Sequence, residues 1–113
     1  MSHRYSKEYE NCIENSGGTT NGIVDCINVE MKKIELEIEK ISSELFAKIP
    51  KEKSNALDSA LKGWRQFLNF GSIAMYDMDM GTMERINTAE WYLSENARML
   101  EWLEDIAHKY EVR

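Results

Sequence analysis

The side chains best suited to chemistry in this chain are two cysteines, Cys12 and Cys26, and two histidines, His3 and His108. A structural zinc site needs four such ligands in one cluster, and histidines at opposite ends of the chain do not complete one. The cysteine spacing also differs from the Cys-x-x-Cys pattern of redox motifs. A disulfide closing this loop would add about 3 kcal/mol of stability. From the residues alone, this bridge and two separate buried thiols both remain open.

Carboxylates are abundant, and helical spacing brings some of them together, as in Glu35 with Glu39. Hydrolysis needs a nucleophile with a base, or two positioned carboxylates. These pairs fall on polar helix faces, where solvated surface charge explains them. Asp105 and His108 have the acid-x-x-His spacing of metal sites in helical bundles, but no second copy exists in the chain. We therefore expect no enzymatic activity, no metal and no cofactor.

The composition is that of one small helical domain. A chain of 113 residues supports a single core. One proline and six glycines are too few for the many turns of a β-sandwich. The net charge of −6 disfavours binding to nucleic acid or anionic lipid and favours a basic partner. No apolar run approaches the ~20 residues that a membrane-spanning helix needs.

Apolar residues recur at steps of three and four through most of the chain, which predicts amphipathic helices. Pro50 suits the start of one helix and Thr82 the cap of another, while Gly71 is expected to bend or shorten its segment. Leu61, Trp64, Phe67 and the isoleucines of the second helix are expected in the core. We predict an all-α bundle of about four helices in one domain, 1–113, with a flexible terminus at 1–8 and helices at about 4–15, 20–48, 51–78 and 82–110.

Two features suggest a surface for a partner. Four methionines, a tyrosine and two aspartates surround the helix junction at 75–83. Adaptable thioethers beside carboxylates suit docking onto a basic protein, although they also suit filling an irregular end of the core. In the last helix two tryptophans lie close to three turns apart, so they share a face, and an exposed one would be an anchor. The candidate partner-binding residues are Tyr76, Asp77, Asp79, Met80, Trp91 and Trp102.

One set of residues is similar to a known family pattern. Thr19 lies midway between Cys12 and Cys26, and an acid-x-x-Leu element is loosely matched at 35–38. Leu61–Phe67 supplies Trp64 and Phe67 of an Ala-x-x-Trp-x-x-aromatic segment, with Leu61 at the alanine position. With these motifs the chain resembles the LprI family of bacterial envelope lysozyme inhibitors over about residues 9–103. It departs from the family at 68–69, where Leu-Asn replaces an Arg-Asp pair, and it lacks the second pair of cysteines.

The resemblance implies a Cys12–Cys26 disulfide and a location in the periplasm or cell envelope after removal of a signal peptide. It also implies a non-catalytic protein that inhibits a lysozyme-like peptidoglycan hydrolase. Similar small helical proteins serve as immunity proteins against type VI secretion effectors, so a toxin effector is the other expected target. A homodimer is compatible with the sequence. The alternative is a cytosolic helical scaffold or dimerisation module with free thiols.

Overall fold

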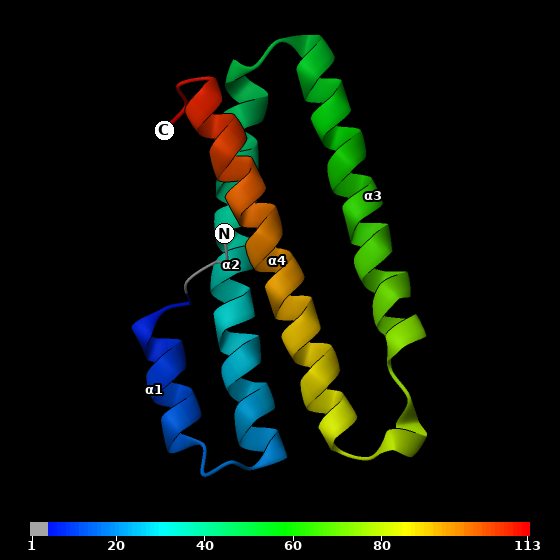
Figure 1. Cartoon of the computed structure of the whole chain (residues 1–113). Helices are drawn as coiled ribbons and strands as arrows, with labels where there is room; N and C mark the ends of the chain where they lie inside the picture. The colour runs from blue at the N-terminus through cyan, green and yellow to red at the C-terminus, as the bar shows by residue number, and fades with distance from the viewer. Residues whose placement is uncertain (1–4) are drawn as a thin grey trace.

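A computed structural model describes residues 5–113, which form an all-α bundle without a strand in that part of the chain. Helices α2 and α4 pack directly against each other, α1 lies along α2, and α3 lies along α4 (Figure 1). The predicted fold class, including the N-terminal disulfide, is confirmed. None of the described helices is long and apolar enough to cross a membrane. The elements are α1 (Lys7–Asn15), α2 (Thr20–Lys48), α3 (Lys51–Met75), the 3-10 turn η1 (Met78–Met80) and α4 (Met83–Lys109).

Most helix limits follow local capping. The limits of α2 agree with the predicted 20–48, and Thr19 caps it by accepting a hydrogen bond from the Gly22 amide at 3.1 Å. Helix α1 begins at Lys7, after the cap Ser6, so two positions of the expected flexible segment 1–8 are helical. Residues 1–4 lie outside the described part of the chain.

The predicted cap at Thr82 is wrong. Its backbone is already helical, with φ −67° and ψ −26°, and its hydroxyl makes no capping hydrogen bond. The chain turns into α4 at Gly81, whose φ of 84° is a left-handed conformation that glycine adopts without steric cost. Helix α3 ends at Met75, three residues before its predicted end, because Asp77 starts the η1 turn.

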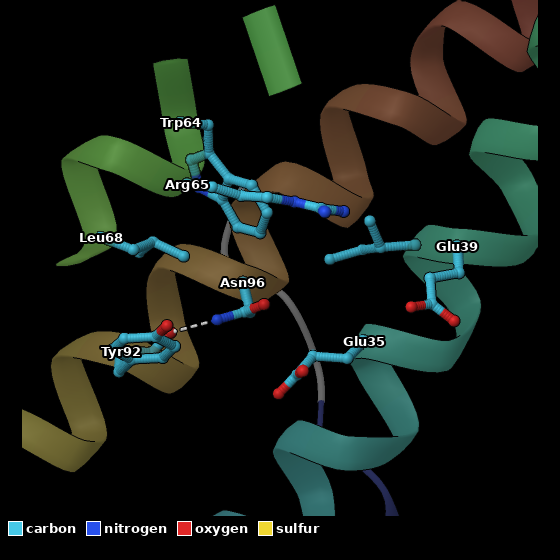
Figure 2. Close-up of a pocket in the computed structure, with 8 residues that line it drawn as sticks. Glu35, Glu39, Trp64, Arg65, Leu68, Tyr92 and Asn96 are labelled. Atoms are coloured by element: carbon cyan, nitrogen blue, oxygen red, sulfur yellow. Dashed lines mark hydrogen bonds between the residues drawn. The ribbon is translucent and has the colours of Figure 1, made fainter. Parts of the chain in front are cut away.

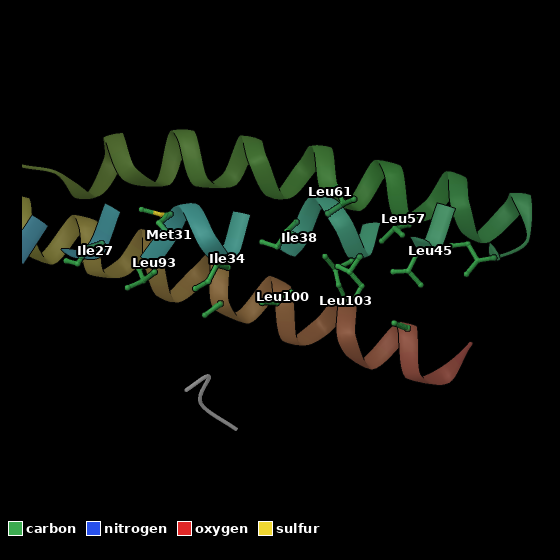
Figure 3. Close-up of a cluster of buried hydrophobic side chains, with 14 residues drawn as sticks. Ile27, Met31, Ile34, Ile38, Leu45, Leu57, Leu61, Leu93, Leu100 and Leu103 are labelled. Atoms are coloured by element: carbon green, nitrogen blue, oxygen red, sulfur yellow. The ribbon is translucent and has the colours of Figure 1, made fainter. Parts of the chain in front are cut away.

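The core lies mainly between α2 and α4, where α2 presents its buried isoleucines to the leucines of α4 (Figure 3). The predicted isoleucine stripe and the buried Leu61 are confirmed, and Trp64 packs half-buried against the same cluster. Phe67 is a wrong prediction, because 53% of it is exposed. It precedes the buried Leu68 by one position, which rotates it about 100° around the helix and away from the core.

Helix α1 is attached to α2 by three kinds of contact. The Cys12–Cys26 disulfide joins the two helices with their Cα atoms 5.7 Å apart. Buried Glu30 accepts hydrogen bonds from the Ser6 amide at 2.8 Å and the Ser6 hydroxyl at 2.7 Å. Tyr9 packs its ring against the core cluster. A short helix that buries little by itself is thereby held in a defined position.

Candidate functional site

The outer side of α3 and the junction after it form the most exposed apolar region of the described chain. Of twelve exposed large hydrophobic side chains, eight lie between positions 67 and 83. Contiguous exposed apolar side chains on a soluble protein mark an interaction site. We call this region the tip surface and define it by Phe67, Phe70, Ile73, Met75, Tyr76, Met78, Met80 and Met83.

Two stripes on α3 explain why the region is exposed. Leu57, Leu61 and Leu68 recur at steps of four and seven and turn toward α2 and α4, where they are buried. Phe67 and Phe70, three residues apart, follow another line on the solvent side of the same helix. A helix with apolar residues on both sides buries only one of them within this fold. The other side stays exposed to solvent.

The junction after α3 projects its methionines into solvent. The Asp77 carboxylate accepts a hydrogen bond from the Asp79 amide at 3.0 Å and so starts the η1 turn. Within that turn 82% of Met78 and 67% of Met80 are exposed. The alternative expectation, that these methionines fill the end of the core, is therefore wrong. Flexible thioether side chains on a short turn can adapt to the shape of another protein.

The charges along this stretch of the chain are negative, and the first cation after it, Arg85, lies beside Tyr76. Residues 66–84 include Asp77, Asp79 and Glu84 but no lysine, arginine or histidine. The next cation along the chain, Arg85, donates a hydrogen bond to the Asn21 side chain at 3.2 Å. The tip surface therefore combines an apolar centre with carboxylates at its edge. This arrangement is complementary to a basic protein surface.

The two candidate tryptophans lie in different places. Trp91 packs edge-on against Phe67, with ring centroids 5.6 Å apart, and so supports the tip surface from α4. A Cβ on Gly71 would lie 2.7 Å from the Trp91 ring. Gly71 therefore gives room for this contact, and α3 continues through it as far as Met75. Trp102, 42% exposed, lies beside Ile49 near the other end of the bundle and is not part of the tip surface.

Tyr76, Asp77, Asp79 and Met80 thus lie together at the junction, while Trp91 packs against Phe67 in the α3 part of the tip surface. Phe70, Ile73 and Met83 extend the same surface and were missing from the predicted set. The signal that could have identified Phe70 and Ile73 was their spacing, which does not fit the stripe of buried leucines on α3.

A second feature is a cavity of about 210 Å³ between α2, α3 and α4 (Figure 2). Its lining comes from three helices, so no local motif in the sequence indicates it. Glu35 and Glu39, expected as solvated surface, are exposed at its rim. The lining residues are Glu35, Ile38 and Glu39 of α2, Trp64, Arg65 and Leu68 of α3, and Tyr92 and Asn96 of α4.

Two raised pKa values are found where α1 meets the core. Burial, followed by the negative charge of Glu30, raises the pKa of the Tyr5 phenol. Burial, followed by the charge of Glu90, raises the pKa of the Tyr9 phenol. Among residues 5–113, no three histidine, cysteine, aspartate or glutamate side chains gather in a way that could hold a metal ion. The tyrosine pKa shifts therefore belong to the packing of α1.

No family model, curated protein or solved structure matches this chain. The resemblance to LprI proteins therefore depends only on the short motifs in the sequence. Of their residues, Cys12 and Cys26 form the disulfide and Thr19 caps α2. The disulfide and the cap both stabilise the fold, so neither identifies a function. The tip surface and the cavity are the features that could bind another molecule.

Proposed function

We propose that this protein is a non-catalytic binding protein of the cell envelope that uses the tip surface to block a lysozyme-like, peptidoglycan-cleaving enzyme. It acts as a lysozyme inhibitor or as an immunity protein against a secreted effector, such as one of a type VI system. The observation that carries this proposal is the gathering of exposed apolar side chains with the carboxylates of Asp77 and Asp79 in one region. A desolvated apolar centre with a charged rim is the usual anatomy of a tight protein interface.

The disulfide supports the envelope location. Bridges such as Cys12–Cys26 persist in oxidising compartments and are rare in the cytosol. The alternative of a cytosolic scaffold assumed two free thiols, and both cysteines are in the bridge. A periplasmic protein also has direct access to the enzymes that cleave peptidoglycan.

The charge distribution supports a basic target. Lysozyme-type muramidases are commonly basic and have clefts lined with carboxylates. The protein carries a net charge of −6, and Asp77 and Asp79 stand at the edge of the tip surface. Long-range attraction would accelerate encounter with a basic enzyme, and the apolar centre would hold the complex after contact.

A second copy of the chain is a less suitable occupant of the tip surface. A two-fold interface would apply the same region of both copies to each other, and the carboxylates of Asp77 and Asp79 would then approach their equivalents. Residues 66–84 include no lysine or arginine, and Arg85, which lies beside Tyr76, donates its hydrogen bond to the Asn21 side chain. Sedimentation velocity distinguishes the two occupants, since we expect a monomer at micromolar concentration.

Calorimetric titration tests the proposal. The oxidised protein is titrated into a panel of muramidases and other cell-wall hydrolases at two salt concentrations, and lytic activity is measured in parallel. We expect saturable binding to a muramidase, weaker at the higher salt concentration, with loss of lysis. Asp77→Lys with Asp79→Lys should weaken this binding at least about tenfold and reduce its salt dependence.

The matched control is Glu10→Lys with Glu14→Lys on α1, which makes the same change in net charge at exposed positions away from the tip surface. This variant should retain most of the affinity. Equal weakening in both variants would show that the affinity depends on the net charge of the protein and not on the position of these carboxylates. Absence of binding across the whole panel would contradict the proposed function.

A further inference from the structure

The cavity between α2, α3 and α4 holds an unpartnered polar group at its base. Only 1% of Asn96 is exposed, and its side-chain amide nitrogen donates to the Tyr92 carbonyl at 2.9 Å and to the Met31 sulfur at 3.4 Å. No donor in the described chain bonds to its amide oxygen, which lies on the side away from the Tyr92 bond in Figure 2. This oxygen can therefore accept a hydrogen bond from a ligand in the cavity.

The ring of Trp64 forms another part of the cavity wall. The indole nitrogen of Trp64 is buried and has no hydrogen-bond partner. Ile38 and Leu68, both buried, supply further apolar surface. The interior of the cavity thus offers an acceptor, the Asn96 amide oxygen, and apolar contact to a ligand.

The rim adds charges of both signs that are not used within the chain. Glu35 and Glu39 lie one turn apart on α2, and Arg65 extends from α3 toward them (Figure 2). None of the three forms an ion pair with another described residue. An arginine binds a carboxylate through paired N–H donors, and two carboxylates suit an ammonium group.

The size of the cavity limits the ligand. At about 210 Å³ it is smaller than the ~300–1,000 Å³ of sites for drug-sized molecules. A small ligand with a carboxylate, an ammonium group and a short side chain satisfies the volume and both signs of charge. We propose that this cavity binds a free α-amino acid in its zwitterionic form. The carboxylate lies at Arg65, the ammonium group lies between Glu35 and Glu39, and the side chain points toward Asn96.

The inference is independent of the tip surface and is tested with the full chain. The oxidised protein is titrated with each proteinogenic L-amino acid up to about 10 mM, with calorimetry and the nitrogen–proton spectrum as readouts. We expect saturable binding of at least one amino acid. Of the three indole N–H signals, that of Trp64, assigned with Trp64→Phe, should move most.

Ligand and protein variants can then be paired. Amidation of the ligand's carboxylate should weaken binding at least about tenfold in the wild type, but it should have little further effect in Arg65→Gln. Acetylation of the ligand's amine should likewise weaken binding in the wild type, but it should have little further effect in Glu35→Gln or Glu39→Gln. Arg98→Gln, at an exposed arginine of α4 outside the cavity, is the control and should bind as the wild type does.

Three results would overturn the inference. They are no binding by any amino acid in this range, equal binding of the ligand capped at both ends, and equal weakening by Arg65→Gln and Arg98→Gln. The thermal unfolding midpoint of each variant without ligand shows whether its fold is intact. None of these outcomes bears on binding at the tip surface, which shares no residue with the lining of the cavity.

Discussion

The α2–α4 pair and the C-terminal third of α3 are both rich in large apolar residues but place them in opposite environments. Ile41, Leu45 and Leu103 are fully buried between α2 and α4. Phe70 and Ile73 on α3 each expose about two-thirds of their surface. The first set stabilises the fold, whereas the second contributes little to it.

This difference separates stability from binding. Burial of an apolar side chain contributes about 1.5–3 kcal/mol to folding, and a side chain that stays in water contributes almost none of that. The buried residues of helix α3 are Leu57, Leu61 and Leu68, and Trp64 packs half-buried against the same core. Its solvent side can therefore change without loss of the fold, which is the property required of a surface that adapts to a partner.

The largest expected effect comes from the α2–α4 core. Leu103→Ala should lower the free energy of unfolding by about 4 kcal/mol, because a fully buried leucine is replaced by a cavity. Phe70→Ala on the tip surface should lower it by less than about 0.5 kcal/mol. Denaturant unfolding measures both values. Similar losses in the two variants would remove the distinction between the regions.

Removal of the disulfide should cause the next largest loss in the free energy of unfolding. Cys12→Ser with Cys26→Ser should cost about 3 kcal/mol, because the unfolded chain gains the freedom of the opened loop. The intact mass of the wild type should also rise by two hydrogens on reduction. An unchanged mass would exclude the bridge in the purified protein, and an unchanged unfolding midpoint in the variant would show that α1 is held by other contacts.

A smaller loss in the free energy of unfolding is expected when the hydrogen bonds between Glu30 and Ser6 are changed. Glu30→Gln should cost about 1.5 kcal/mol, since a buried carboxylate that accepts two hydrogen bonds from Ser6 is replaced by a neutral amide. The exposed Glu10→Gln on α1 is the matched control and should change stability by less than about 0.5 kcal/mol. Equal losses in both variants would assign the effect to charge alone.

The smallest effect is expected at alkaline pH. Because the folded chain raises the pKa of Tyr5 and Tyr9, their phenols ionise at lower pH in the unfolded chain. Their contribution is complete below the ordinary tyrosine pKa of about 10 and is lost as pH rises above it. Unfolding midpoints across this range should fall less in Tyr5→Phe with Tyr9→Phe than in the wild type. A parallel fall in both proteins would contradict this.

The sequence predicts the fold well because periodicity and capping are local. The limits of α2 follow from Thr19 at one end and from Pro50 after the other. The solvent side of α3 was harder to predict, because Phe67 and Leu68 are equally apolar and only the positions of α2 and α4 decide which of them is buried. The cavity at Asn96 is lined by three helices, and no local sequence pattern predicts which residues of different helices lie together.

The candidate site was predicted in part for the same reason. Tyr76, Asp77, Asp79 and Met80 are neighbours in the chain, so the sequence alone placed them together. Trp102 shares a helix face with Trp91, but the length of α4 separates it from the junction. Spacing on one helix gives direction around its axis, whereas a binding surface also needs proximity along it.

Hydrogen–deuterium exchange of the protein with and without an inhibited muramidase tests most directly whether the tip surface is the interface. We expect added protection in peptides that cover residues 66–84, with α1 and the last turns of α4 unchanged. Protection at α1 or around Trp102, with the peptides of the tip surface exchanging as in the free protein, would contradict the assignment.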